Sequence, residues 1–237
     1  MSKLPIGTFV NMTTVVIGSV IGLMLREVFP ENIQNITLIA VGLSILIIGI
    51  RMSIKVPEEY LVIFIFSLII GGIIGEFMGV EGFLDGCENW INNNFRIGKV
   101  RFTEGLITAF VLFCASSLTI VGAIEEGMQG KRELLLVKSA LDGVTAIALA
   151  SSYGVGVLVS IVPMLIIQGG LTILAVNAKH LFNKSAIALL SGVGGVLIVA
   201  ISIKILGLGD FRVANLLPSL VVVIFLLWGY SKLNLKM

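Results

Sequence analysis

Residues 60–79, YLVIFIFSLIIGGIIGEFMG, contain a single charged side chain, Glu76. An α-helix needs about 20 consecutive apolar residues to cross the hydrocarbon of a bilayer, and this segment has that length. Working outward from it, eight segments of this kind can be marked, at 6–25, 35–50, 60–79, 104–123, 136–150, 154–176, 186–205 and 214–230. The sequence therefore predicts an all-α, polytopic membrane protein of about eight transmembrane helices, forming one integral membrane domain over residues 1–237.

The composition of the whole chain agrees with a lipid environment. Of its 237 residues, 57% are hydrophobic and only 13% are charged, and the mean hydropathy is +1.09. A soluble domain typically has about 25% charged residues. The net charge is +2 and no basic run is present, so the lipid bilayer, and no nucleic acid, is the expected partner.

The segment 136–150 is the weakest of the expected spans. It is short and contains Lys138 and Asp142. A segment of this kind can be tilted, broken or re-entrant where protein or a water-filled cavity surrounds it. Whether it crosses the membrane completely is left open by the sequence.

Basic residues in the short connections predict the orientation. With eight spans, one side of the membrane receives nine of them: Lys3, Arg51, Lys55, Lys131, Arg132, Lys179, Lys184, Lys232 and Lys236. The other side receives six: Arg26, Arg96, Lys99, Arg101, Lys204 and Arg212. This bias predicts that both termini face the cytoplasm.

A longer connection carries an amphipathic pattern. Within about 81–92, the apolar residues recur at helical spacing opposite three acidic ones, the two sets being Phe83, Leu84, Cys87, Trp90 and Ile91, and Glu81, Asp85 and Glu88. We expect a helix lying in the membrane interface, acting as an anchor or alternatively as a gate.

The chain also contains a weak internal repeat. The segment 40–52, AVGLSILIIGIRM, resembles 193–205, VGGVLIVAISIKI, with Gly42 aligned to Gly195 and Arg51 to Lys204. The matched spans are five steps apart, so two units at 5–79 and 154–230 would insert in opposite senses around central helices at 104–150. This pattern predicts an inverted 3+2+3 repeat, as found in secondary transporters; the alternative is chance similarity between apolar helices.

Polar side chains inside the expected spans mark a candidate pathway, because such groups are costly in lipid unless they face protein, water or a ligand. The candidates for a substrate or ion pathway are Asn11, Thr108, Ser116, Ser117, Thr119, Asp142, Gln168 and Asn215. They can equally hydrogen-bond neighbouring helices. Lys138 and Asp142, four residues apart, can also be no more than a local ion pair.

No enzymatic or cofactor chemistry is expected. His180 is the single histidine and has no nearby cluster of cysteines or carboxylates, so neither a metal site nor a catalytic triad is predicted. Neither glycine cluster continues into the Lys–Ser/Thr pair of a nucleotide-binding loop. We therefore predict no catalytic residues, no metal and no cofactor.

Six motifs occur in order along nearly the whole chain: GTFVN (7–11), GGIIGE (71–76), FCASSLTIVGAIEEG (113–127), KSALDG (138–143), QGGLT (168–172) and RVANLLP (212–218). Together they resemble the bacterial domain-of-unknown-function 554 membrane proteins, the YdfK/YqgA-like group. The resemblance implies a multi-pass protein of the bacterial inner membrane. It implies no substrate.

The leading functional prediction is a transporter or channel for a small solute or ion. The runner-up is a membrane scaffold or sensor whose polar residues only join helices, and an intramembrane enzyme ranks last for want of a nucleophile–base pair. A cavity that reaches Asp142 would favour the first. Short loops and glycine faces also predict a homo-oligomer.

Overall fold

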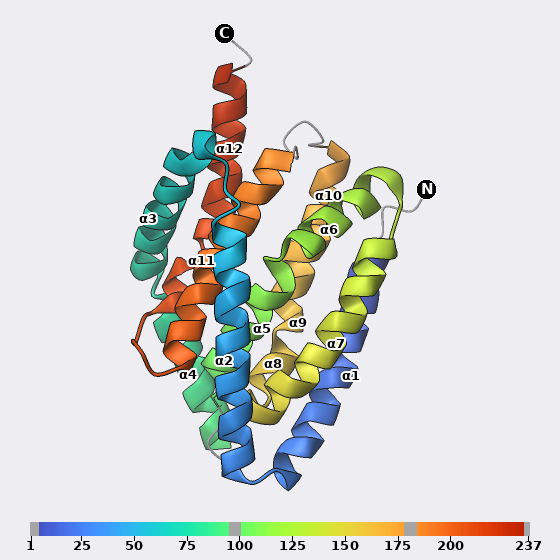
Figure 1. Ribbon diagram of the computed structural model, residues 1–237, viewed down its shortest axis with the longest axis vertical. Coiled ribbons are helices and arrows are strands. Elements are labelled where there is room, and N and C mark those ends of the chain that lie inside the picture. The colour runs from blue at the N-terminus through green and yellow to red at the C-terminus, as the bar shows by residue number, and fades with distance from the viewer. Residues whose placement is uncertain (1–4, 95–100, 178–183, 235–237) are drawn as a thin grey trace.

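The computed structural model describes residues 5–94, 101–177 and 184–234, and these residues form helices and no strand (Figure 1). The α-helices are α1 (Ile6–Val28), α2 (Glu31–Ser53), α3 (Leu61–Met78), α4 (Val80–Asn94), α5 (Phe102–Cys114), α6 (Ser117–Gln129), α7 (Glu133–Tyr153), α8 (Gly156–Val159), α9 (Ile161–Met164), α10 (Gly170–Asn177), α11 (Lys184–Ile205) and α12 (Ser219–Asn234). Shorter turns are η1 (Glu58–Tyr60), the π-helical η2 (Leu165–Gly169) and η4 (Val213–Leu216).

Seven helical stretches among the described residues are long and apolar enough to cross a membrane: Ile6–Val28, Glu31–Ser53, Glu58–Met78, Glu133–Tyr153, Gly156–Ala175, Ala186–Ile205 and Val213–Tyr230. Helices α5 and α6 make an eighth if they are counted as one span, bent by 55°. The predicted all-α membrane fold with about eight spans is therefore confirmed.

Two spans differ from expectation. The segment at 136–150, expected to be the weakest, is the continuous 21-residue helix α7, because the helix extends beyond its apolar centre to Glu133 and Tyr153. The break falls instead in the expected span 104–123, which divides into α5 and α6 at Ala115 and Ser116.

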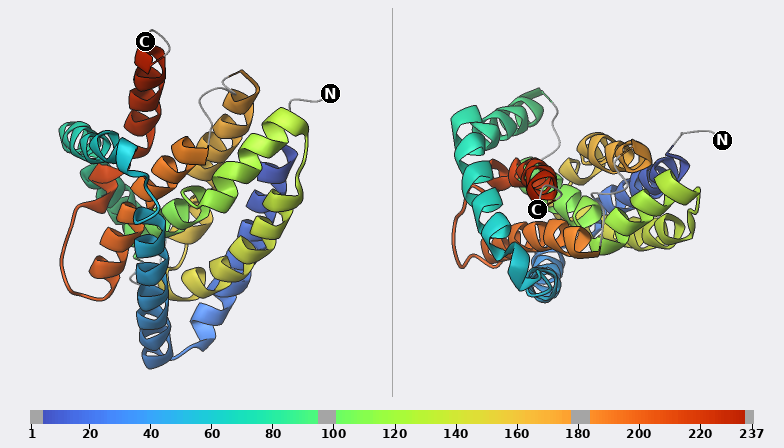
Figure 2. Two further views of the ribbon diagram at one scale, coloured as in Figure 1. Left: turned by 45° about the horizontal axis from the view of Figure 1, so that its top comes forward. Right: turned by 90° about the horizontal axis from the view of Figure 1, so that it is seen from above.

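The chain passes back and forth along one long axis, and the start of α1 and the end of α12 lie toward the same end of the molecule (Figure 1). The spans form neighbouring pairs: α1 lies against α7, α2 against α11, α3 against α12, and α6 against α10. In the view from above, the green segment that contains α5 and α6 lies near the middle of the bundle (Figure 2). Eleven of the 13 residues of α5 are buried, so this helix belongs to the core of the bundle.

Glycines set the distance between the paired helices. A methyl group on Gly18 of α1 would overlap the carbonyl oxygen of Gly143 in α7, and one on Gly22 would overlap that of Ile147. At the crossing of α2 and α11, a methyl group on Gly49 would lie 2.7 Å from the carbonyl oxygen of Gly195. Small residues thus let backbones touch, as is common between membrane helices.

Helix α4 covers the predicted amphipathic segment. Its Phe83 and Trp90 side chains are exposed, whereas Leu84 and Cys87 pack against the hydrophobic core. The predicted helix is present, but its apolar side chains are divided between core and surface, and Glu81 of the predicted acidic face is buried. Its location at the membrane interface stays a prediction.

Candidate functional site: a polar centre inside the bundle

An ion pair lies in the middle of α7. Asp142 is the tenth of the 21 residues of this helix, and Lys138 lies one turn earlier on the same face. Their side chains form an ion pair, and the two residues are 2% and 7% exposed, respectively. Both charges are thus held away from water, with each as the other's main compensation.

Two amide side chains from other spans complete the centre. Asn11 of α1 donates a hydrogen bond from Nδ2 to Asp142 Oδ2 at 3.0 Å and is 3.2 Å from Gln168 Oε1. Both amides are fully buried. Asn11 Oδ1 and Gln168 Nε2 have no hydrogen-bond partner among the described residues.

Gln168 reaches this centre from an irregular stretch of helix. Pro163 lacks a backbone donor, and two residues later the helix widens into the π turn η2, Leu165–Gly169, which contains Gln168. Single π turns inside α-helices occur frequently at functional sites. We attribute the position of the Gln168 amide beside Asn11 to this π turn, because a regular α-helix would turn residue 168 to a different face.

The break between α5 and α6 lies on the other side of the ion pair. Ser116 caps α6, because its Oγ accepts a hydrogen bond from the backbone N–H of Thr119 at 3.2 Å. The Thr119 hydroxyl in turn donates to the Phe113 carbonyl oxygen at 2.6 Å. Two hydroxyls thus satisfy backbone groups that the break leaves open. The side chain of Ser117, also a predicted pathway residue, lies outside the part described.

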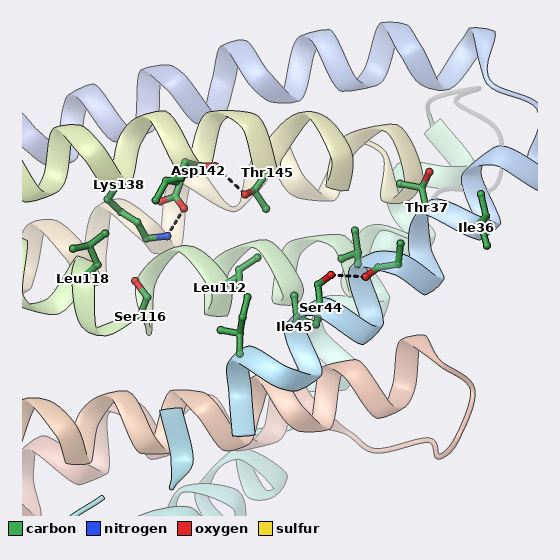
Figure 3. Close-up of a pocket in the computed structure, with 14 residues that line it drawn as sticks. Ile36, Thr37, Ser44, Ile45, Leu112, Ser116, Leu118, Lys138, Asp142 and Thr145 are labelled. Atoms are coloured by element: carbon green, nitrogen blue, oxygen red, sulfur yellow. Dashed lines mark hydrogen bonds and ion pairs between the residues drawn. The ribbon is translucent and has the colours of Figure 1, made fainter. Parts of the chain in front are cut away.

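A groove of about 690 Å³ runs along α2 and reaches the ion pair (Figure 3). Its walls come from α2, α5, α6 and α7, and its lining is Ile36, Thr37, Ala40, Val41, Ser44, Ile45, Ile48, Leu112, Ser116, Leu118, Lys138, Leu141, Asp142 and Thr145. Most of these side chains are apolar. The polar ones are Thr37 and Ser44 on α2, Ser116 at the break between α5 and α6, and Lys138, Asp142 and Thr145 on α7.

The hydroxyls of this groove are arranged as acceptors. Thr37, Ser44 and Thr145 each donate to the carbonyl oxygen four residues earlier in their own helix, at 2.8 Å. Their hydrogens are therefore used internally, and their oxygen lone pairs remain available. Thr37 and Ser44 were not predicted from the sequence, although two hydroxyls seven residues apart on one face of an apolar helix are a usable signal.

Two predicted pathway residues lie elsewhere. Asn215, in η4, donates from Nδ2 to Glu76 Oε2 at 2.6 Å and accepts at Oδ1 from the backbone N–H of Glu81 at 2.8 Å. It fastens η4 to α3 and α4 and does not contact the Asp142 centre. Thr108 is buried in α5 and lines a small cavity beside Glu104 and Lys204. The structure thus joins Asn11, Asp142 and Gln168 directly and adds Ser116 through the groove.

The other buried carboxylates have structural partners at the ends of the spans. Glu81 accepts from Lys204 Nζ at 3.1 Å and from the backbone N–H of Ala214 at 2.9 Å. Glu126 accepts at Oε1 from the first turn of α1, at Gly7, and from Arg132. No group of three or more His, Cys, Asp or Glu residues gathers in the described parts of the chain, and His180 lies outside them.

Fold and centre together define a polytopic α-helical membrane protein with a charged polar centre inside its bundle. The chain belongs to the family described as "Protein of unknown function (DUF554)", whose model matches residues 6–228. This confirms the family inferred from the motifs.

Two relatives match this chain over nearly their whole length. The chain is 33% identical over 230 residues to the "Uncharacterized membrane protein YdfK" of Bacillus subtilis (strain 168), which covers 95% of this chain and 98% of that protein. It is 35% identical over 222 residues to the "Uncharacterized protein YqgA" of Escherichia coli (strain K12), covering 92% and 94%. No solved structure matches.

Proposed function

We propose that the protein moves a small solute or ion across the membrane along a pathway that contains Lys138 and Asp142. The observation that carries this proposal is the groove that reaches both members of a buried ion pair. A charged pair inside a membrane protein is costly and typically lies on an ion or substrate pathway. A scaffold or sensor whose polar residues only join helices needs the helix–helix contacts and gives the groove no role. We propose no enzymatic activity.

We further propose that α1–α3 and α8–α12 are two inverted three-helix units. If a twofold axis relates α2 to α11 with an offset of 153 residues, Gly42 corresponds to Gly195 and Gly49 to Ser202. A contact between Gly49 and Gly195 then requires a contact between Gly42 and Ser202. Both occur: Gly49 closely approaches Gly195, and the Ser202 hydroxyl donates to the Gly42 carbonyl oxygen at 2.7 Å.

A second pair of contacts follows the same offset. A methyl group on Gly42 would lie 3.0 Å from Leu206 Cδ2, and one on Gly195 would lie 2.7 Å from Ser53 Oγ. Under the same offset, Gly42 corresponds to Gly195 and Ser53 corresponds to Leu206. The pairing of α1 with α7 likewise has a counterpart in that of α10 with α6. Any antiparallel helix pair gives contacts of this form, so the support for inverted units comes from the similarity of residues 40–52 to 193–205 together with the matched pairings of α1 with α7 and of α10 with α6. Inverted units of this kind are typical of secondary transporters, with the site at their interface.

The proposed location is the bacterial inner membrane with both termini in the cytoplasm. In support, the first turns of α1 and the last turns of α12 lie at one end of the bundle (Figure 1). Among described residues that end carries Arg51, Lys55, Lys131, Arg132 and Lys184, against Arg26, Arg101, Lys204 and Arg212 at the other. The homo-oligomer stays a prediction from the sequence.

A flux assay tests the transport proposal. Purified protein in liposomes is expected to move at least one of a panel of inorganic ions and small organic solutes, and Asp142→Asn is expected to abolish that flux while folding normally. Asp85→Asn, an exposed aspartate on α4, is the matched control and should retain it. Wild-type flux in a folded Asp142→Asn protein would exclude Asp142 from the pathway, and a wild type that moves nothing in the panel would count against transport.

A further inference from the structure

The Lys138 ammonium occupies a cation site built by other residues. Its Nζ pairs with the Asp142 carboxylate and lies 5.7 Å from the centre of the Phe113 ring. A carboxylate together with the face of an aromatic ring is a recurrent way to bind an ammonium group. The groove beside it presents hydroxyl oxygens whose hydrogens are already used.

We propose that Asp142 anchors a binding site for a primary ammonium cation with a short apolar body, and that Lys138 is its tethered occupant. The inference rests on the proposed function in one respect: such a cation would be the transported solute. The binding site itself can be tested without any measurement of transport.

The lining and volume of the groove indicate what is attached to the ammonium group of the ligand. Its lining is mostly aliphatic, with Ile45, Leu112 and Leu141 among the side chains along its length, and its volume of about 690 Å³ lies within the usual range of small-molecule pockets. A lysine side chain is itself a four-carbon alkylammonium that runs along apolar surface to reach an anion. A free alkylammonium ion can therefore repeat the contacts of Lys138 at Asp142 and place its carbon chain in the groove.

The Lys138 side chain can extend its ammonium group toward the start of α7 when a ligand binds at Asp142. It lies five residues after Glu133, the first residue of α7, which is about 7.5 Å along the helix axis. Long lysine side chains near helix ends extend their ammonium groups to the membrane interface. Asp142 lies a further turn inside and has a short side chain, so it stays in place as the anchor.

Few other charged groups lie near Lys138 and Asp142, where the ligand ammonium would replace that of Lys138. Among the residues that line the groove, Lys138 and Asp142 are the only charged ones in the part described. The next ion pair on a neighbouring helix is Glu126 of α6 with Arg132, and the nearest thiol is the buried Cys114 of α5. A second cation beside Asp142 would leave the site with uncompensated positive charge, so ligand binding requires that the Lys138 ammonium leave.

The test is a binding titration on the full chain in lipid nanodiscs. Lys138→Ala removes the tethered competitor, whose effective concentration is millimolar or higher, so hexylammonium should bind at least about tenfold more tightly than to the wild type. At ten times the dissociation constant, the unfolding midpoint should rise by about 3–6 °C. The double variant Lys138→Ala/Asp142→Asn should lose this response, and Lys184→Ala, an exposed lysine of α11, should behave as the wild type.

A neutral ligand separates charge recognition from simple filling of an apolar groove. The alcohol 1-hexanol has the same carbon chain as hexylammonium and lacks the charge. Equal shifts with both ligands, or an unchanged hexylammonium response in the double variant, would show that the groove accepts any apolar chain, such as a lipid tail, and would overturn the proposal.

A folding defect in Lys138→Ala also gives an answer, because the variant leaves Asp142 without its counter-ion. Such protein should become monodisperse when it is purified in hexylammonium chloride and not in sodium chloride or 1-hexanol. Failure of hexylammonium to rescue it would overturn the inference. Binding without flux of the same cation would retain the site and refute only the transport proposal.

Discussion

The buried ion pair should show strong energetic coupling in a double-mutant cycle of Lys138→Met, Asp142→Asn and the combined variant. Each single change removes one charge from a pair that is more than 90% buried. The Asn introduced at position 142 retains an oxygen that can accept the hydrogen bond from Asn11 Nδ2. The cycle therefore isolates the electrostatic part of the interaction better than truncation to alanine.

The magnitude follows from the geometry. Two unit charges about 3 Å apart attract by about 5–6 kcal/mol at an effective dielectric constant of 20, and removing one partner of a buried pair typically costs about 3–5 kcal/mol. In Lys138→Met the carboxylate can instead take up a proton, which costs an ordinary aspartate about 4 kcal/mol at pH 7 and about 1.5 kcal/mol at pH 5. The loss in this variant should therefore be about 3–4 kcal/mol at pH 7 and should shrink as the pH falls.

Asp142→Asn should cost less than Lys138→Met, about 1–3 kcal/mol, because the freed ammonium can extend toward the end of α7. The double variant should cost less than the sum of the two, by about 3 kcal/mol of coupling. Unfolding by SDS in mixed micelles, followed by the fluorescence of Trp90 and Trp228, measures these differences. The partly exposed pair Arg101–Glu104, at 3.8 Å, is the control cycle and should couple by less than about 1 kcal/mol. Additivity at Lys138 and Asp142 within about 0.5 kcal/mol would refute the account of the centre.

Three further outcomes are expected. Gly49→Val should destabilise the protein by about 1–3 kcal/mol, because its side chain meets the Gly195 carbonyl oxygen; Gly229→Ala, where nothing lies within 4 Å, should cost nothing, and equal losses would contradict the crossing. Ser116→Ala should cost about 1 kcal/mol through loss of the cap on Thr119, and Ser116→Thr should restore it; a neutral Ser116→Ala would refute the cap. Reporter fusions should place both termini in the cytoplasm, and termini on opposite sides would refute the span count.

The spans were predictable because hydropathy over about 20 residues reflects one dominant force, the exclusion of polar groups from lipid. Their interruptions were not. The segment around Cys114, Ala115 and Ser116 reads as continuous apolar helix, and its break depends on the cap from Ser116 and on the close approach of Gly194 to Ala115. Contacts of this kind join residues far apart in the sequence, so no local pattern reports them.

Part of the polar centre was predictable for a related reason. Asn11, Asp142 and Gln168 are conspicuous in apolar spans, and the structure joins all three. Asn215 is equally conspicuous, yet it lies in the turn η4 with Glu76 and Glu81 as its partners. The cost of a buried amide shows that it has a partner, and it does not show which one.

The two central spans, α7 and the broken span α5–α6, satisfy their buried polar groups in different ways. Because α1 lies against α7 as α10 lies against α6, the proposed twofold exchanges α7 with the broken span α5–α6. One of these spans is continuous and holds a charged pair, and the other is broken and held by the hydroxyls of Ser116 and Thr119. Apolar residues in place of a buried ion pair are often neutral or stabilising, so stability alone gives no reason for Lys138 and Asp142. The proposed exchange of one ammonium group for another at Asp142 does give that reason. In the proposed arrangement of inverted units, the pair lies between the units, on the path of a transported cation.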